Sequence, residues 1–281
     1  MKLSSVTVQP SSVLNYAYFV KAAYDLFRAH PTVLNPSQNQ YTSFPAGYKL
    51  VSNIQMVDFF GPIQEKVFYG FIAQSLASPS TYVLAIRGTV TYMEWWDDFH
   101  IEPTPYPYAT KAGNVATGFL DLYESMTMTV PGSNEPAVAL RKSIKPSSGG
   151  SFSLAGADSL ILTGHSLGAA LVTLYGAEFA GTKTGASVAI YTLASPKTGD
   201  LGFVTYFDSL ISESYRVYNL PDVVPTLPPG FGYTQVPMGI GIDSLLNPNV
   251  KWNLGCFHAL VTYMYILGGP LSLLGTCRST S

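Results

Sequence analysis

The chain has 281 residues, 47% of them apolar, and a formal net charge of −2. That charge leaves no basic surface for nucleic acid, so we expect no nucleic-acid partner. Charged residues make up only 11% of the chain, against about 25% in typical soluble domains. A neutral surface of this kind suits contact with an oily substrate, although a merely weakly charged protein fits the composition equally well. We expect one domain over residues 1–281, because α/β domains often reach this length.

Helices and strands alternate along the chain. The apolar spacing of residues 15–30 predicts a helix that Asn15 caps and Pro31 ends. Further helices are predicted over residues 118–126, 169–179 and 258–266, and strands over residues 66–73, 81–86, 186–193 and 214–220. The alternation favours a mostly parallel α/β sheet, with the active site outside the carboxyl ends of its strands. The apolar stretch at residues 257–274 contains a histidine and a Gly-Gly-Pro break, so we expect a buried helix and tail and no transmembrane segment.

A glycine-flanked turn stands at the centre of this pattern. An apolar run over residues 159–163 leads into Gly-His-Ser-Leu-Gly, and a segment rich in helix formers follows. This order predicts a strand, a sharp turn and a helix, with Ser166 at the apex. We expect Gly164 and Gly168 to be sites where a β-carbon would collide with the neighbouring helix or strand. The turn is typical of a nucleophile held near the positive end of a helix, and an ordinary strand-to-helix turn is the alternative.

A serine hydroxyl needs a base before it becomes an effective nucleophile. In hydrolases built around such a turn, the chain order is serine, acid, histidine. Of the four histidines, only His258 follows Ser166, so elimination and order make His258 the predicted base. His165 is adjacent to the serine, and we expect its side chain to pack or hydrogen-bond beneath the turn.

The acid that orients the base is predicted to be Asp222. It follows the strand predicted over residues 214–220 and lies between Pro221 and Pro225, which fix the geometry of the loop. Asp200 also follows a strand and is the alternative. Its other interpretation is an aspartate that caps a turn or a helix.

The oxyanion of the reaction needs preorganised donors. The backbone N–H of Leu167 is one, and Thr89, after the strand predicted at residues 81–86, offers an N–H and its hydroxyl as the second. The amphipathic segment at residues 90–99 is a candidate lid. Its apolar side chains are Tyr92, Met93, Trp95 and Trp96. A surface helix with both tryptophans packed inside is the alternative.

Two features bear on the compartment of the protein. Cys256 and Cys277 could form one disulfide that closes the C-terminal tail, or remain two buried thiols, and their number does not decide between them. Residues 1–6 carry one lysine and no apolar run, so no signal peptide is predicted.

These motifs together resemble the class 3 lipases, the α/β-hydrolase family of the filamentous-fungal triacylglycerol lipases. The likeness extends over roughly residues 65–265. It rests on residues 86–89 (Ile-Arg-Gly-Thr), 94–99 (Glu-Trp-Trp-Asp-Asp-Phe), 117–119 (Thr-Gly-Phe), 163–168 (Thr-Gly-His-Ser-Leu-Gly), 194–200 (Ala-Ser-Pro-Lys-Thr-Gly-Asp) and 216–229.

The resemblance implies a catalytic triad, an oxyanion hole and a lid at the positions already named. The triad would be Ser166, Asp222 and His258, with Thr89 beside Leu167 in the oxyanion hole. It also implies no metal or organic cofactor, a structural role for Asp200, and export from the cell, although the chain shows no signal peptide. We expect a monomer that works at a lipid–water interface.

The predicted function is therefore carboxylic ester hydrolysis through an acyl-enzyme, most simply on acylglycerols. A phospholipase and a soluble, feruloyl-type esterase are alternatives on the same scaffold. Outside enzymes, the alternative is a catalytically silent lipid-binding relative, against which the intact triad positions argue.

Overall fold

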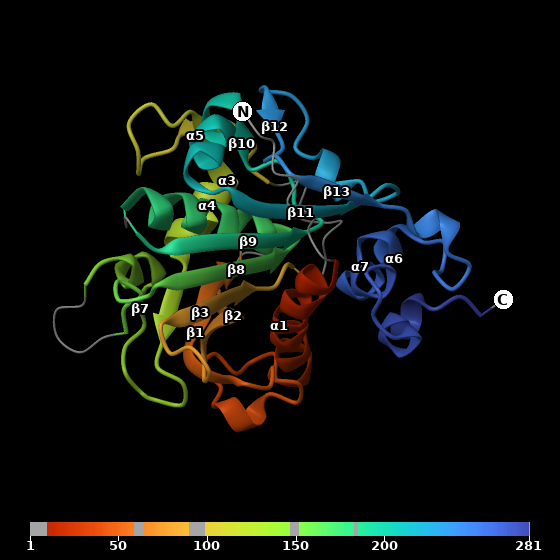
Figure 1. The fold of residues 1–281 in the computed structure, drawn as a ribbon, viewed down its shortest axis with the longest axis horizontal. Helices are drawn as coiled ribbons and strands as arrows, with labels where there is room; N and C mark the ends of the chain where they lie inside the picture. The colour runs from red at the N-terminus through yellow and green to blue at the C-terminus, as the bar shows by residue number, and fades with distance from the viewer. Residues whose placement is uncertain (1–9, 59–64, 90–98, 147–151, 183–184, 281) are drawn as a thin grey trace.

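A computed structural model of the chain describes residues 10–58, 65–89, 99–146, 152–182 and 185–280. In these residues, nine strands form a central sheet in the order β13-β11-β9-β8-β3-β2-β1-β6-β7. The strands are β1 (Tyr48–Asp58), β2 (Glu65–Ser75), β3 (Thr81–Ile86), β6 (Thr127–Thr129), β7 (Val138–Ala139), β8 (Ser159–His165), β9 (Ser187–Leu193), β11 (Glu213–Asn219) and β13 (Gly239–Ile242). Figure 1 shows this sheet running through the middle of the molecule.

The sheet has a parallel half and an antiparallel half. β13, β11, β9, β8 and β3 run parallel to one another. β2, β1, β6 and β7 extend the sheet in antiparallel order. A second, four-stranded sheet contains β12 (Tyr233–Thr234), β10 (Gly199–Asp200), β5 (Asn114–Ala116) and β4 (Pro103–Pro105). The parallel half carries the candidate site, because the carboxyl ends of its strands meet at one edge.

Helices cover both faces of the central sheet (Figure 1). They are α1 (Pro10–Ala29), α3 (Thr117–Ser125), α4 (Leu167–Thr182), α5 (Leu201–Leu210), α6 (Leu254–His258) and α7 (Leu260–Ile266). Short 3-10 helices are η1 (Gln38–Gln40), η2 (Leu140–Ile144), η3 (Val224–Thr226), η4 (Ser244–Leu246) and η5 (Leu271–Cys277). One buried cluster joins α3, α4 and α5 to the sheet, and a second joins α1 and α7 to its other face. α4 is buried on almost every side, which explains why its sequence is apolar all round.

The predicted α/β-hydrolase fold is confirmed, and most predicted elements lie within a few residues of their expected bounds. One helix start was wrong, and one long strand was missed. The first helix begins at Pro10, so Asn15 lies inside it and does not cap it. β1 was not predicted, because buried polar residues, among them Asn53 and Gln55, interrupt its apolar pattern.

The helix predicted over residues 258–266 is α7, which begins at Leu260, whereas His258 is the last residue of a separate helix, α6. Ala259 has φ −59° and ψ 131°, so its extended backbone separates α6 from α7. The break releases the carbonyl of His258 from helical hydrogen bonding, and that carbonyl instead meets the ring of His165. A disulfide between Cys256 and Cys277 ties α6 to the C-terminal tail, which settles the question the sequence left open. Among the described residues, no helix is long and apolar enough to cross a bilayer.

Candidate active site

The turn between β8 and α4 places Ser166 at the edge of the sheet. Ser166 has φ 57°, a left-handed conformation that is strained for a residue with a side chain. The turn can be this tight only because its flanking residues lack a β-carbon. A β-carbon on Gly164 would lie 2.4 Å from the carbonyl oxygen of Gly168, and one on Gly168 would lie 2.3 Å from that of Ile86. The predicted collision at both glycines is confirmed, and backbone atoms that cannot rotate away cause it.

Ser166, His258 and Asp222 form one hydrogen-bonded line. His258 Nε2 lies 2.9 Å from Ser166 Oγ, and His258 Nδ1 lies 2.8 Å from Asp222 Oδ2. A carboxylate accepts only, so Nδ1 carries the imidazole proton and Nε2 is left to accept the proton of the serine hydroxyl. All three side chains are buried. The structure therefore brings together the three residues that the sequence predicts as a triad, in the geometry of a general base and its orienting acid.

Asp222 is held by two further donors. Its Oδ1 accepts the backbone N–H of Val224 at 3.0 Å, and its Oδ2 accepts the hydroxyl of Tyr263 at 2.7 Å. Burial and the neighbouring carboxylate raise the pKa of Tyr263 well above its ordinary value, so the hydroxyl stays protonated and donates. Sequence reasoning missed Tyr263. No motif marks it, and only the packing of α7 against β11 brings it to the carboxylate.

Asp200, the alternative acid, performs a different task. It is the N-cap of α5, where its Oδ1 accepts the backbone N–H of Phe203 at 2.9 Å. Its Oδ2 accepts from the side-chain amide of Asn114 at 2.7 Å. These contacts fit the capping interpretation and leave Asp222 as the aspartate that contacts the histidine.

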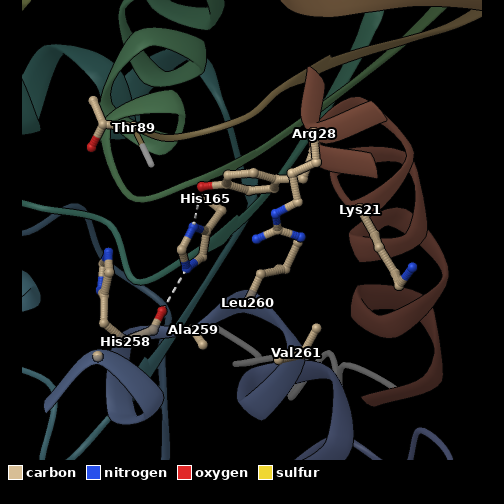
Figure 2. Close-up of a pocket in the computed structure, with 10 residues that line it drawn as sticks. Lys21, Arg28, Thr89, His165, His258, Ala259, Leu260 and Val261 are labelled. Atoms are coloured by element: carbon tan, nitrogen blue, oxygen red, sulfur yellow. Dashed lines mark hydrogen bonds between the residues drawn. The ribbon is translucent and has the colours of Figure 1, made fainter. Parts of the chain in front are cut away.

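His165 lies beneath the turn and joins three elements. The backbone N–H of Gly88 donates to the hydroxyl of Tyr24 at 2.8 Å, and that hydroxyl lies 2.9 Å from His165 Nδ1. Because the Tyr24 oxygen accepts from Gly88, its own proton goes to Nδ1. His165 Nε2 then carries the ring proton and donates it to the backbone carbonyl of His258 at 2.8 Å. Figure 2 shows the ring of His165 and its contact with the backbone carbonyl of His258.

Burial keeps the two titratable groups in this series of hydrogen bonds, His165 and Tyr24, in one protonation state. It lowers the pKa of His165 well below its ordinary value, and the adjacent His258 lowers it further, so the ring stays neutral with one N–H. Burial raises the pKa of Tyr24 to about 12, so its hydroxyl keeps the proton that it donates. These hydrogen bonds link the loop after β3 to the backbone of His258, the histidine that contacts Ser166.

The loop after β3 runs directly against the turn. A β-carbon on Gly88 would lie 2.8 Å from Ser166 Cβ, so the loop contacts the turn at Gly88, and Thr89 is the next residue. Thr89 is buried, and its hydroxyl has no hydrogen-bond partner within the described part of the chain. Leu167 is the first residue of α4, where backbone N–H groups have no helical acceptor. Both residues therefore offer donors beside Ser166.

The candidate lid cannot be placed. Tyr92, Met93, Trp95 and Trp96 lie outside the described residues, so the predicted lid stays a prediction. Across the residues that are described, no group of three or more histidine, cysteine, aspartate or glutamate side chains is arranged to hold a metal ion.

Comparisons with known proteins agree with this geometry. The family model described as lipase (class 3) matches residues 83–231, which is more than half of the chain. Phospholipase A1-II 4 of Oryza sativa subsp. japonica is 33% identical over 202 residues, which cover 66% of this chain and 50% of that protein. Secreted mono- and diacylglycerol lipase 1 of Fusarium solani is 30% identical over 152 residues, covering 54% of this chain and 40% of that protein. The chain thus spans about half the length of the curated relatives it matches, or less.

Solved structures with the same fold include a lipase from Rhizopus microsporus var. chinensis. It matches with a TM-score of 0.59 and 24% identity, over 87% of this chain and 77% of its own. Lip2 lipase from Yarrowia lipolytica matches with a TM-score of 0.57 and 20% identity, over 88% of this chain and 82% of its own. At these identities the likeness establishes the fold.

Proposed function

The chain belongs to the class 3 lipase family, and from that premise we propose that it is a serine ester hydrolase acting on acyl esters of glycerol. The observation that carries the proposal is the buried line from Asp222 through His258 to Ser166, with contacts of 2.8 and 2.9 Å. One ring nitrogen of His258 contacts a serine at the apex of a strained turn, and the other contacts a carboxylate. A histidine that served stability alone would need neither partner in this arrangement.

The contacts define the role of each residue in the proposed reaction. His258 Nε2 takes the proton of Ser166 as Oγ attacks the ester carbonyl, and returns it to the departing alcohol oxygen. Asp222 holds Nδ1–H and stabilises the imidazolium that forms between these steps. The backbone N–H of Leu167 and the hydroxyl of Thr89, which has no partner among the described residues, donate to the oxyanion. Water then repeats the sequence on the acyl-enzyme and releases the fatty acid.

The names of the relatives point to the glycerol ester as the shared substrate feature. The plant relatives are phospholipases A1 and the Fusarium relative is a mono- and diacylglycerol lipase, and these names share hydrolysis of an acyl ester on glycerol. Nothing in the described residues favours a feruloyl-type esterase over a hydrolase of glycerol esters.

We further propose that the enzyme works as a monomer at a lipid–water interface. Large apolar side chains are exposed in the two segments that frame Asp222 and His258. Leu246 is 82% exposed, Trp252 74% and Leu220 63%. The backbone N–H of Leu220 donates a hydrogen bond to the carbonyl of Ile242. The side-chain amide of Asn219 donates one to the carbonyl of Phe257, so hydrogen bonds join the two segments. Exposed apolar groups this large, close to a buried site, suit contact with a lipid surface.

Covalent labelling tests the proposed activity. A fluorophosphonate should modify Ser166, and Ser166→Ala should lose both the label and turnover of tributyrin, with a loss on the order of 10⁶-fold in kcat. Ser209→Ala, at an exposed serine, is the matched control and should keep both. A label on another residue, or turnover that survives Ser166→Ala, would contradict the proposal.

A further inference from the structure

A pocket of about 220 Å³ adjoins the candidate triad on the side of α1 and α7. Figure 2 shows Arg28 reaching from α1 toward Leu260 at the start of α7, with Lys21 on the same helix and its amine directed away from the guanidinium of Arg28. His258 and Thr89 also line it, so the pocket reaches both the histidine of the triad and the candidate oxyanion donor. Pockets that enclose whole drug-sized ligands measure roughly 300–1,000 Å³. This pocket is smaller than that range, so it holds one small group and not a whole ligand.

Two basic side chains, Lys21 and Arg28, line the pocket. Among the described residues, no carboxylate lines it. Lys21 Nζ is paired with Asp25 at 2.6 Å on the same helix. Arg28 lies over the ring of Tyr24, 5.3 Å from its centroid, and forms no ion pair with any described residue. The guanidinium of Arg28 therefore has donors available for an anion, and Lys21, although paired with Asp25, is a second basic group in the same pocket.

The position of the pocket fixes which part of a substrate reaches it. His258 delivers the proton to the departing alcohol oxygen, so the alcohol part of the ester lies against this histidine. In a glycerol ester, that part is the glycerol with its remaining substituents. His258, Arg28 and Lys21 line the same pocket, so we infer that a substituent a few bonds beyond the ester oxygen lies on the side of Arg28 and Lys21.

We propose that this pocket is an anion subsite that takes the phosphate of a glycerophospholipid, with Arg28 as its principal ligand and Lys21 as its second. A phosphate offers the oxygens that a guanidinium contacts in pairs, and a neutral acylglycerol has nothing for either cation to bind. Arg28 and Lys21 are then specificity residues that favour phosphate-bearing glycerol esters over neutral ones. The inference rests on the proposed ester hydrolase activity.

The test compares two soluble substrates that differ only in the phosphate. Dihexanoylglycerophosphate and dihexanoylglycerol are each hydrolysed below the concentrations at which they aggregate, so binding to a charged surface plays no part. Arg28→Gln should lower kcat/KM on the phosphate ester about tenfold, the scale of one exposed charge-assisted hydrogen bond, and leave the neutral ester within about twofold. Lys21→Gln should produce a smaller loss in the same direction, and Arg28→Lys should restore part of the rate.

A matched control separates loss of the anion subsite from the loss of one positive charge anywhere on the protein. Arg278→Gln removes the same charge from an exposed position on the C-terminal tail and should change neither rate. Equal loss on both substrates, or no loss on either, would overturn the subsite and leave the ester hydrolase standing. Failure of the unaltered protein to cleave either ester would instead overturn the proposed function.

A competition experiment distinguishes a lipid phosphate from a free anion. Glycerol 3-phosphate should inhibit hydrolysis of the neutral ester competitively, and Arg28→Gln should relieve the inhibition. Inorganic phosphate that inhibits in the same Arg28-dependent way, without any preference of the enzyme for the phosphate ester, would assign the pocket to a free anion and overturn the proposal.

Discussion

Asp222 and Asp200 each follow a strand of the central sheet, but their carboxylates have different partners. Asp222 contacts the ring of His258, whereas Asp200 caps α5. Asp222→Asn should lower kcat about 10⁴-fold, because an amide no longer holds the histidine in the tautomer that accepts the serine proton. Steady-state rates on a soluble ester measure this.

Asp200→Asn is the matched substitution for that experiment. Asparagine caps helices nearly as well as aspartate, so kcat should stay within a few-fold of the original value. Similar losses of kcat at both positions would refute the assignment of Asp222 as the acid.

Tyr24 tests whether the contacts beneath the turn affect the reaction. Its hydroxyl bonds both the N–H of Gly88 and the ring of His165, so Tyr24→Phe leaves two buried polar groups without a partner. We expect a loss of about 1–3 kcal/mol in the free energy of unfolding and about a tenfold fall in kcat, with KM little changed. Tyr18→Phe, at an exposed position on the same helix, should change none of these quantities. An unaltered kcat in Tyr24→Phe would show that these contacts serve stability alone.

At the scale of elements, α6 and α7 position the histidine, and the disulfide holds them. Cys256 lies two residues before His258, and its bond to Cys277 closes a loop with a sequence separation of 21 residues. Removing such a closure costs about 3 kcal/mol on the chain-entropy estimate. We therefore expect the double variant Cys256→Ser/Cys277→Ser to unfold at lower denaturant concentration.

The position of the disulfide also predicts how activity responds to denaturant. The loop that it closes contains His258, so the double variant should lose activity at denaturant concentrations below those that unfold the central sheet. Activity and far-ultraviolet circular dichroism, recorded across the same denaturant series, measure the two events. Coincident midpoints would show that α6 and α7 do not open separately from the sheet.

At the scale of the whole molecule, we expect the exposed apolar side chains of the segment before His258 to set the response to a lipid surface. The double variant Leu246→Ser/Trp252→Ser should weaken binding to neutral phospholipid vesicles and slow hydrolysis of emulsified tributyrin. It should leave hydrolysis of the dissolved ester unchanged, because neither side chain is part of the buried line of contacts.

The control for that variant is an equally exposed apolar residue elsewhere. Leu76 directly follows β2, at the sheet edge where β3 begins and opposite to the carboxyl end of β3, and it is 60% exposed. Leu76→Ser should leave vesicle binding intact. If it weakens binding as much as the double variant does, the lipid contacts the molecule without preference for the region around the triad.

The sequence by itself determined the fold class and the three residues of the buried line. Local rules suffice for this, because the glycines that permit the turn at Ser166 are neighbours in the chain, and only one histidine follows them. The prolines on either side of Asp222 likewise mark a fixed loop after a strand. Each of these signals depends on residues close to one another in sequence.

The tertiary structure alone decided what surrounds that line. Tyr263 on Asp222, the link from Tyr24 through His165 to the carbonyl of His258, and the Cys256–Cys277 bond all join residues far apart in the chain. So does the charged pocket between α1 and α7. No local pattern specifies which distant side chains meet, because their approach is set by how helices pack on the two faces of the sheet.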